Sequence, residues 1–246
     1  MDRRLYQELY ELEEVHWWFR GRRRIIRAFL KLALARKVRQ ALDIGAGTGG
    51  NLPMLAEFAE IVEASEDSDE AIALARRRAP AIQIEKKFFP GGSYEGQYNL
   101  VTLFDVLEHI SDDGAALLKL ESMLAPEGIA LLTVPALPFL WTVHDELAHH
   151  QRRYTKKSLK KLIAGNTKLK IVRLSYFNSF LFLPIVLVRT VRKLLRFGEG
   201  SSDFFMLPAP LNNLLATLFS SEAGILKTFD LPIGVSLVCL LQKVDA

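Results

Sequence analysis

The chain has 246 residues, of which 50% are hydrophobic and 24% are charged, a balance that excludes an intrinsically disordered protein and allows one full α/β core with an appendage. Its single cysteine, Cys239, excludes an internal disulfide and a multi-cysteine metal site. The net charge of +4 is modest, and the charged first residues do not resemble a signal peptide, so we expect a cytoplasmic protein.

The first 37 residues are predicted to form a helical cap. Residues 3–14 carry Leu5, Leu9 and Leu12 at helical spacing, which predicts a short amphipathic helix. A second helix is predicted over residues 24–37. The sequence His16-Trp17-Trp18-Phe19 stands between them. Because two adjacent tryptophans cannot face the same side of a helix, at least one should reach into a cleft, unless the motif simply packs against a sheet.

A glycine-rich turn follows the first predicted strand, Val38 to Ile44. Its sequence is Gly45-Ala46-Gly47-Thr48-Gly49-Gly50-Asn51, and a helical pattern covers residues 51–58. Glycine permits a positive φ and lacks the Cβ atom that would keep a ligand away. The first N–H groups of the new helix point across the turn. This arrangement predicts the nucleotide-binding elbow of a doubly wound sheet.

The glycine spacing alone also fits a dinucleotide-binding loop. Asp43 separates the two interpretations, because it stands on the strand two residues before the first glycine. A carboxylate there repels a pyrophosphate and attracts the ammonium group of an amino-acid-like ligand. Glu66 follows the second predicted strand, residues 60–65. It lies about 20 residues beyond the first glycine, near the spacing at which a strand-end acid meets ribose hydroxyls.

A second motif follows the fourth predicted strand. A helix over residues 68–78 and a short strand over residues 81–84 come first, and the strand over residues 98–104 then leads into Asp105-Val106-Leu107-Glu108-His109-Ile110. These residues stand where a strand gives way to a helix, at the carboxyl edge of the sheet. Ligands bind along that edge in open α/β folds.

The following pattern completes the predicted sheet. It predicts a helix over residues 112–124, a fifth strand over 129–134, a helix over 158–163, a sixth strand over 170–176 and a last strand from residue 234. The loop over residues 135–154 holds three of the five histidines. We therefore expect this loop to belong to an active site.

Residues 177–233, between the last two strands, form an insertion that is too long for a plain loop. Residues 180–188 are apolar and contain Pro184, and basic residues follow at 189, 192, 193 and 196. An apolar run this short cannot span a bilayer, which needs about 20 residues. The insertion is predicted to be a helical lid, a dimer contact or a surface that faces a membrane interface.

The two motifs resemble those of the class I S-adenosylmethionine-dependent methyltransferases. Asp43 followed by Gly-x-Gly-x-Gly is similar to the first motif of that family. Val106-Leu107-Glu108-His109 is similar to the Val-Leu-Glu-His signature of members that act on small molecules and quinone precursors. The resemblance covers roughly residues 38–176 and the last strand.

The resemblance implies an α/β fold, a Rossmann-like doubly wound sheet of seven strands with an antiparallel last strand. Residues 1–37 would be the N-terminal helical cap. Residues 38–176 and 234–246 would form the cofactor-binding core, and residues 177–233 the helical insertion.

The resemblance also implies S-adenosyl-L-methionine as cofactor and S-adenosyl-L-homocysteine as product. Asp43 would hold the methionine ammonium and Glu66 the ribose hydroxyls. Lys86 and Lys87 stand where the family often has an acid near the adenine, which leaves the adenine contacts open. The residues expected to bind the cofactor are Asp43, Gly45, Ala46, Gly47, Thr48, Gly49, Asn51, Glu66, Asp67, Phe104, Asp105, Val106 and Trp17.

A base would assist methylation of a hydroxyl, and histidine suits this task near neutral pH. The candidates are His109, His144 and His149, although His109 could instead hold the end of the strand by a hydrogen bond. Asp105, Glu108 and His109 also resemble the acid-x-x-Glu-His of the ubiquinone-pathway O-methyltransferases, in which a divalent ion can assist the acceptor. Because similar residues are common in relatives without a metal, we assign no metal ligand.

The expected function is methyl transfer to a small molecule, in particular to a hydroxyl on a lipid-linked, glycan or quinone-like intermediate. The arginine clusters leave an RNA methyltransferase as an alternative, although no Asn-Pro-Pro-Tyr-like motif follows the fourth strand. A non-catalytic protein that binds the cofactor is a further alternative. We expect a monomer or homodimer, with peripheral contact to the cytoplasmic face of a membrane through residues 177–197 left open.

Overall fold

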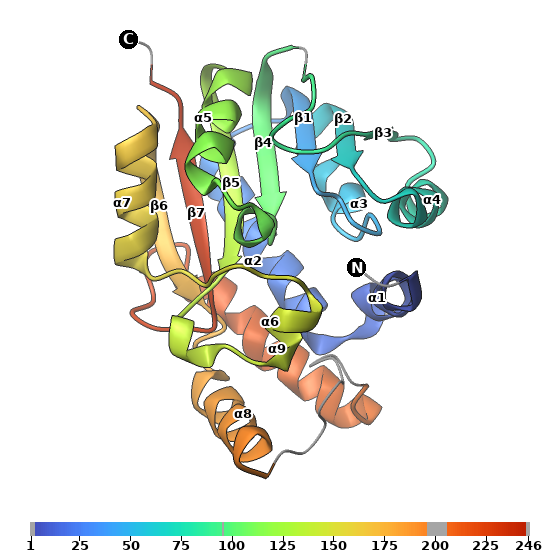
Figure 1. The fold of residues 1–246 in the computed structure, drawn as a ribbon, viewed down its shortest axis with the longest axis vertical. Coiled ribbons are helices and arrows are strands. Elements are labelled where there is room, and N and C mark those ends of the chain that lie inside the picture. Colours follow the sequence, from blue (N-terminus) through green and yellow to red (C-terminus); the bar gives the residue numbers. More distant parts are fainter. Residues whose placement is uncertain (1–2, 95, 196–205, 245–246) are drawn as a thin grey trace.

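A seven-stranded sheet forms the centre of the molecule in the computed structural model, which describes residues 3–94, 96–195 and 206–244 (Figure 1). Residues 196–205 of the predicted insertion lie outside this range. The strand order is β3-β2-β1-β4-β5-β7-β6. The strands are β1 (Val38–Ile44), β2 (Ala59–Glu66), β3 (Gln83–Lys86), β4 (Tyr98–Phe104), β5 (Leu124–Pro135), β6 (Lys170–Phe177) and β7 (Ser236–Gln242). The first five run parallel and β7 is antiparallel to both neighbours, which confirms the predicted fold.

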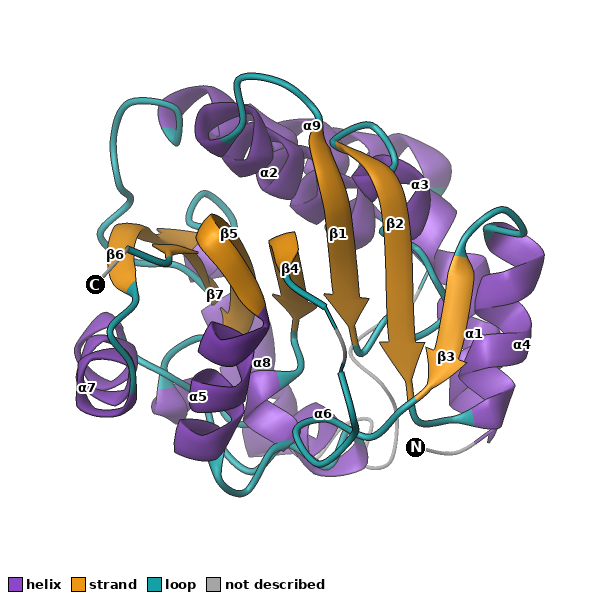
Figure 2. Cartoon of the chain, turned by 90° about the horizontal axis from the view of Figure 1, so that it is seen from above, coloured by secondary structure: helices purple, strands orange, loops and turns teal. Residues whose placement is uncertain are grey.

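Helices cover both faces of the sheet. They are α1 (Arg3–Val15), α2 (Trp17–Ala33), α3 (Leu52–Leu55), α4 (Asp69–Arg78), α5 (Asp113–Met123), α6 (Val143–Leu147), α7 (Lys156–Asn166), α8 (Phe182–Leu195) and α9 (Ala209–Ile225), with short 3₁₀ turns η1 (Leu107–His109) and η2 (Pro138–Leu140). Figure 2 shows α2, α3 and α9 on one face and α5 and α7 on the other. Within the described residues, no helix is both long enough and apolar enough to cross a bilayer.

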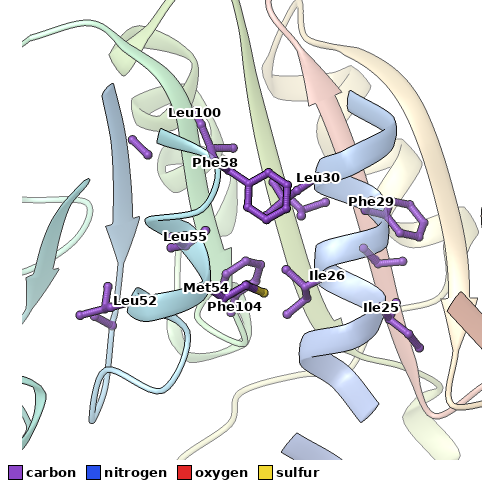
Figure 3. Close-up of a cluster of buried hydrophobic side chains, with 14 of the residues drawn as sticks. Ile25, Ile26, Phe29, Leu30, Leu52, Met54, Leu55, Phe58, Leu100 and Phe104 are labelled. Atoms are coloured by element: carbon purple, nitrogen blue, oxygen red, sulfur yellow. The ribbon is translucent and has the colours of Figure 1, made fainter. Parts of the chain in front are cut away.

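The helix α2 builds most of the core on its face of the sheet. Four side chains at helical spacing, Ile25, Ile26, Phe29 and Leu30, are completely buried. Figure 3 shows Ile26 and Leu30 pointing toward the α3 segment and β4, and Ile25 and Phe29 pointing to the other side of α2. Burial of side chains of this size stabilises the fold by about 1.5–3 kcal/mol each, so α2 is an integral layer of the fold.

The bounds of several elements differ from the prediction. The second helix begins at Trp17, not at residue 24, because Nδ1 of His16 caps it by accepting the N–H of Trp18 at 3.3 Å. It ends at Ala33, since Leu34 has an extended backbone. The first crossover helix is only α3, four residues long, and it has a proline in its first turn. The strand β3 starts two residues later than predicted.

The predicted insertion contains two helices with different surroundings. The helix α9 packs on α2 at Gly21, where a Cβ atom would lie 2.2 Å from Cδ1 of Phe219. The Phe219 ring in turn stacks on Phe177 at the end of β6, with a centroid distance of 6.1 Å. The helix α8 lies at the end of the molecule beyond the carboxyl ends of the parallel strands (Figure 1). Thus α9 belongs to the core, and α8 borders the carboxyl edge.

Candidate active site

A cavity of about 1320 Å³ opens at the carboxyl edge of the sheet. Its walls come from α1, the start of α2, the glycine turn, the ends of β2 and β4, the loop around α6, and the facing sides of α8 and α9. A pocket for one drug-sized ligand usually measures about 300–1000 Å³. The volume is therefore large enough for two small molecules side by side.

Most of the residues that the sequence singled out line this cavity. They are Trp17, Gly45, Ala46, Gly47, Thr48, Asn51, Glu66, Asp67, Phe104, Asp105, Val106, His109, His144 and His149. Two others do not contact it among the described residues. Asp43 is buried behind the wall, and Gly49 packs against α4, where a Cβ atom would lie 3.1 Å from the backbone of Ala75.

The glycine turn is held by the end of β2. The N–H groups of Gly45 and Ala46 both donate to the carbonyl oxygen of Ser65, at 2.9 and 3.1 Å. Gly45 and Gly47 have φ values of +67° and +55°, which glycine adopts at little cost. A Cβ atom on Gly45 would lie 2.6 Å from Val106, whereas one on Gly47 would meet nothing within 4 Å. The turn therefore leaves open space in front of Gly47 where a ligand can approach the backbone.

The carboxylate of Glu66 is fixed at the edge of the turn. Its Oε2 accepts the N–H of Gly47 at 2.9 Å, and its Oε1 accepts those of Asp67 and Ser68 at 3.1 and 3.2 Å. Burial raises the pKa of Glu66 above its ordinary value. A carboxylate has about four acceptor positions, so it retains capacity for ligand hydroxyls on the cavity side.

Asp43 is almost completely buried, and its Oδ1 accepts a hydrogen bond from the hydroxyl of Thr102 at 2.5 Å. Burial raises the pKa of Asp43 to about 7, against the lowering effects of Thr102 and Arg22. A nearby cation stabilises the ionised form of such a buried acid. Asp43 and the open glycine turn together fit a ligand that carries both an ammonium group and hydroxyls.

The helix α1 covers the glycine turn through Glu13, which sequence reasoning missed. The Glu13 carboxylate contacts the hydroxyl of Thr48 and forms an ion pair with Arg78 of α4. Arg78 also donates to the carbonyl oxygen of Thr48 at 2.9 Å, and its guanidinium lies 4.2 Å from the ring centroid of Tyr10. This network joins the N-terminal cap to the turn. No motif signalled it, because its members are far apart in the sequence.

Asp105 lies at the end of β4 with a φ of +57°, an unusual backbone conformation for a residue other than glycine. Its N–H donates to the carbonyl oxygen of Thr133 at 2.9 Å, and its carboxylate forms an ion pair with Arg22 of α2. Arg22 also donates to the Thr133 hydroxyl at 3.0 Å and lies 5.0 Å from the Trp18 ring centroid. The tryptophan motif thus covers an ion pair on the cavity wall, and Arg22 is a second residue that the sequence did not reveal.

Three imidazoles cluster on the opposite wall. The ring of His150 lies 4.7 Å from that of His109 and 6.2 Å from that of His144, measured between centroids. Nδ1 of His150 lies 2.8 Å from Oδ1 of Asp145. Asp145 in turn accepts hydrogen bonds from Nε and Nη2 of Arg153 at 2.8 and 2.9 Å. His150, which was not among the predicted bases, is therefore held by a buried ion pair.

The neighbouring His149 has a different place. Its side chain is exposed, and its backbone is left-handed, with a φ of +58°. This conformation follows the end of α6 and turns the chain, so that the next residue faces Asp145. The prediction chose His149 over His150, and only the backbone reversal distinguishes the two. The one signal in the sequence was that two acids, two histidines and two arginines occur close together within residues 145–153.

Glu108 lies next to His150, with its Oε1 3.9 Å from Nε2. It is completely buried, and neither carboxylate oxygen has a hydrogen-bond partner within the part of the chain that the structure describes. Burial, followed by the charge of Asp105, raises its pKa well above the ordinary value. Ligand atoms of Glu108, His109 and His150 lie within 4.8 Å of one another. This donor set differs from the predicted alternative of Asp105, Glu108 and His109, and its chemistry also suits a divalent transition metal.

The remaining wall is apolar and comes from the two ends of the chain. Trp17 and Trp18 of α2 lie on one side. Ile185 and Val188 of α8, together with Leu215 of α9, lie on another. Lys87 and Phe88 border the cavity beyond β3, where the sequence left the adenine contacts open. The cavity thus combines a polar glycine turn with an apolar compartment.

Comparisons with known proteins agree with this architecture. A family model described as a methyltransferase domain matches residues 17–169. No curated protein matches the chain in sequence.

Solved structures match the chain in fold at low sequence identity. Phosphoethanolamine N-methyltransferase 2 of Haemonchus contortus, in complex with S-adenosyl-L-methionine, matches with a TM-score of 0.60 and 14% identity over 90% of this chain and 52% of that chain. The present chain thus spans about half the length of that enzyme. N-methyltransferase NodS of Bradyrhizobium japonicum, in complex with S-adenosyl-L-homocysteine, matches with a TM-score of 0.58 and 14% identity over 96% and 91% of the two chains.

The [4+2]-cyclase SpnF also matches, with a TM-score of 0.58 and 14% identity over 90% of this chain and 81% of that chain. At these identities the likeness establishes the fold, and the same fold occurs in proteins with different activities. The family match covers more than half of the chain, including the glycine turn and the motif after β4. The chain therefore belongs to the methyltransferase-domain family and has the class I methyltransferase fold.

Proposed function

We propose that this protein transfers the methyl group of S-adenosyl-L-methionine to a hydroxyl group of a small molecule that has an apolar part, with His150 as the general base. One observation carries this proposal. In the cavity that the glycine turn also lines, the imidazole of His150 is held by Asp145 at 2.8 Å through Nδ1. Its Nε2 lies 3.9 Å from Oε1 of Glu108, beyond hydrogen-bond distance, which leaves Nε2 for an acceptor.

The residues of the glycine turn suit this cofactor. When bound, the cofactor supplies an electrophilic methyl group on a sulfonium. The backbone in front of Gly47 would border its methionine portion, and Glu66 would accept hydrogen bonds from the ribose hydroxyls. Asp43 would act through the wall of the turn and stabilise the ammonium group by its charge. The open space at Gly47 and the spare acceptor capacity of Glu66 support this assignment.

His150 has the surroundings that a general base requires. When the Nδ1–H group of His150 donates a hydrogen bond to Asp145, Nε2 carries the lone pair and can take the proton of a hydroxyl as the oxygen attacks the methyl group. Burial acts to raise the pKa of Asp145, but hydrogen bonds from His150 and Arg153 outweigh it and hold the pKa below its usual range. Asp145 therefore stays ionised and stabilises the protonated imidazole.

The neighbours of His150 leave it as the base of the cluster. Burial and the adjacent His150 lower the pKa of His109 to about 4, so His109 is neutral near pH 7 and holds its proton weakly. A His109 nitrogen also bonds the backbone of His149. Burial raises the pKa of Glu108 well above its ordinary value. The neutral His109 and the raised pKa of Glu108 suit an acceptor that enters in its neutral form.

The apolar compartment supports an acceptor with a hydrophobic portion. Side chains from α2, α8 and α9 meet there, among them Trp17, Ile185 and Leu215. Apolar walls bind apolar groups in approximate proportion to the area removed from water. A lipid-linked or quinone-like hydroxyl compound would place its apolar part in this compartment and its hydroxyl at His150.

The test is to incubate the protein with cofactor labelled in the methyl group and with separate lipid, polar-metabolite and RNA fractions of a cell extract. We expect label in the organic-soluble fraction, in a bond that survives mild alkali, because a methyl ether is stable there and a methyl ester is not. Replacement His150→Ala should lower the transfer about a hundredfold or more and leave cofactor binding unchanged. Label in RNA, alkali-labile label, or full activity of His150→Ala would contradict the proposal.

A further inference from the structure

The helix α8 carries an apolar stripe on its outer side. Leu183, Leu187 and Val191 recur every four residues, so they share one face of the helix. Their exposed fractions are 75%, 65% and 42%. Side chains of this size exposed singly are common, but a continuous stripe of them on one helix marks an interaction surface.

The other sides of α8 are held by the rest of the molecule. Phe182 is buried and packs in a cluster with Leu140 and Val235, with Ile185 against it. Nη1 of Arg189 donates to the carbonyl oxygen of Leu140 at 3.1 Å. The stripe is therefore presented by a helix with a fixed orientation.

The apolar surface reaches the cavity. Val188 of α8 is 49% exposed and also lines the cavity, so it joins the outer surface to the interior. Phe139 lies next to Leu140 in η2 and exposes 67% of its surface. Figure 1 shows α8 at the extreme end of the molecule, beyond the carboxyl ends of the parallel strands. A flat partner could therefore contact α8 and cover the cavity opening at the same time.

The charges of α8 discriminate between partners. Its sequence contains Arg189, Arg192 and Lys193 and has no acidic residue. A second copy of α8 would bring an equally basic helix and no opposite charge. An anionic phospholipid bilayer offers both an apolar interior and negative headgroups, and helices with an apolar stripe and basic residues lie in that interface.

We propose that α8, together with Phe139, docks the protein on the surface of an anionic phospholipid bilayer, and that the methyl acceptor enters the cavity from that bilayer. The second half rests on the proposed function, whereas the docking does not. The acceptor would then be a membrane-resident amphiphile with a hydroxyl near its polar end. Its apolar part would pass along Val188 into the compartment between α2, α8 and α9.

The experiment is flotation of the purified protein with vesicles of phosphatidylcholine alone and of phosphatidylcholine mixed with phosphatidylglycerol. We expect the wild type to float with the mixed vesicles and much less with the neutral ones. The double variant Leu183→Asp/Leu187→Asp should lose roughly tenfold or more in partitioning, because two apolar side chains no longer enter the interface. A separate variant, Phe139→Asp, should also weaken partitioning into the mixed vesicles. The test therefore does not depend on correct folding of the double variant alone.

A matched control is Leu118→Asp on α5, which covers one face of the sheet together with α7 (Figure 2), and the Leu118 side chain is 57% exposed. It should float like the wild type. Absence of flotation by the wild type, or unchanged flotation of both α8-side variants, would overturn the proposal. So would a wild-type dimer in sedimentation that the double variant converts to monomer without any vesicle binding, since the stripe would then belong to a second copy.

Calorimetry with S-adenosyl-L-homocysteine separates this proposal from the proposed function. Intact binding by a variant that no longer floats shows that the membrane contact alone was lost. A wild type that floats but binds no S-adenosyl-L-homocysteine would contradict the proposed function and leave the docking in place.

Discussion

Nδ1 of His150 lies 2.8 Å from Oδ1 of Asp145, and the same carboxylate receives two hydrogen bonds from Arg153. The imidazole is thus positioned by a buried ion pair in a loop that otherwise has little regular structure. A side chain held in this way loses little further freedom when it meets a substrate. The arrangement leads to the first of four predictions.

Replacement His150→Ala should lower the rate of methyl transfer about a hundredfold to ten-thousandfold, the usual contribution of a positioned general base. The affinity for S-adenosyl-L-homocysteine should stay within about twofold, since the neighbours of the ring are Asp145, His109 and His144 rather than the proposed cofactor ligands. The matched control is His149→Asn, because His149 is exposed and asparagine tolerates its left-handed backbone. Equal loss in both variants would assign the effect to the loop rather than to the imidazole.

Asp43→Asn should change stability in a pH-dependent way. Burial raises the pKa of Asp43 from 3.8 to about 7, so the unfolded wild type releases its proton at lower pH than the folded protein does. Its contribution to stability is complete below about pH 4 and is lost as the pH rises towards 7. Asparagine does not ionise, so the variant loses no stability in this pH range. Its free energy of unfolding should exceed that of the wild type by on the order of 4 kcal/mol at pH 8, less any packing cost.

This prediction is measured by thermal unfolding of the ligand-free wild type and variant at pH 5 and pH 8. The melting temperature of the variant relative to the wild type should be higher at pH 8 than at pH 5. The variant should bind S-adenosyl-L-homocysteine more weakly than the wild type at both pH values. A stability difference that does not vary between these two pH values would show that Asp43 is ionised throughout. That outcome would also remove the argument that Asp43 awaits a cation.

Gly21→Ala should destabilise the protein, although alanine is favoured over glycine in a helix by about 1 kcal/mol. The added Cβ atom would lie 2.2 Å from the buried ring of Phe219, so α2 and α9 would have to separate. Overpacking of this kind typically costs about 1–3 kcal/mol. The matched control is Gly165→Ala in α7, where a Cβ atom meets nothing within 4 Å. The control should be stabilised, and equal shifts of the denaturation midpoints would contradict this account.

Removal of divalent ions should leave methyl transfer unchanged, because the proposed chemistry needs only the lone pair of His150. Added Zn²⁺ should instead inhibit, since Glu108, His109 and His150 lie close enough to bind it and binding would occupy that lone pair. Activity is measured after treatment with a chelator and then during titration with Zn²⁺ and Mg²⁺. Loss of activity in chelator, restored by an ion, would replace the general-base mechanism with a metal-assisted one.

The order of strands and helices could be predicted because it depends on local patterns. Apolar runs, the glycine turn and the acid at the end of β2 each signal their structure within a few residues. Boundaries were less accurate where a single side chain decided them. His16 begins α2 earlier than predicted by capping it, and Leu34 ends it earlier by leaving the helical conformation.

The sequence also predicted that the glycine turn and Glu66 lie together, because consecutive residues form the turn and Glu66 lies at a strand end next to it. It did not predict the contacts of the histidine cluster, because these depend on backbone reversal and on distant segments. The left-handed residue His149 turns the chain so that His150, one position later, meets Asp145.

The sequence by itself determined the family, the doubly wound sheet with its antiparallel last strand, and the place of the glycine turn, because these follow from the periodicity and order of adjacent residues. The tertiary structure alone decided which histidine is held, that Arg22 pairs with Asp105, and that Glu13 ties α1 to the turn. It also decided that α9 belongs to the core and that α8 presents its stripe outward. The physical reason is that burial, ion pairing and side-chain direction arise between segments far apart in the chain, and no local pattern encodes them.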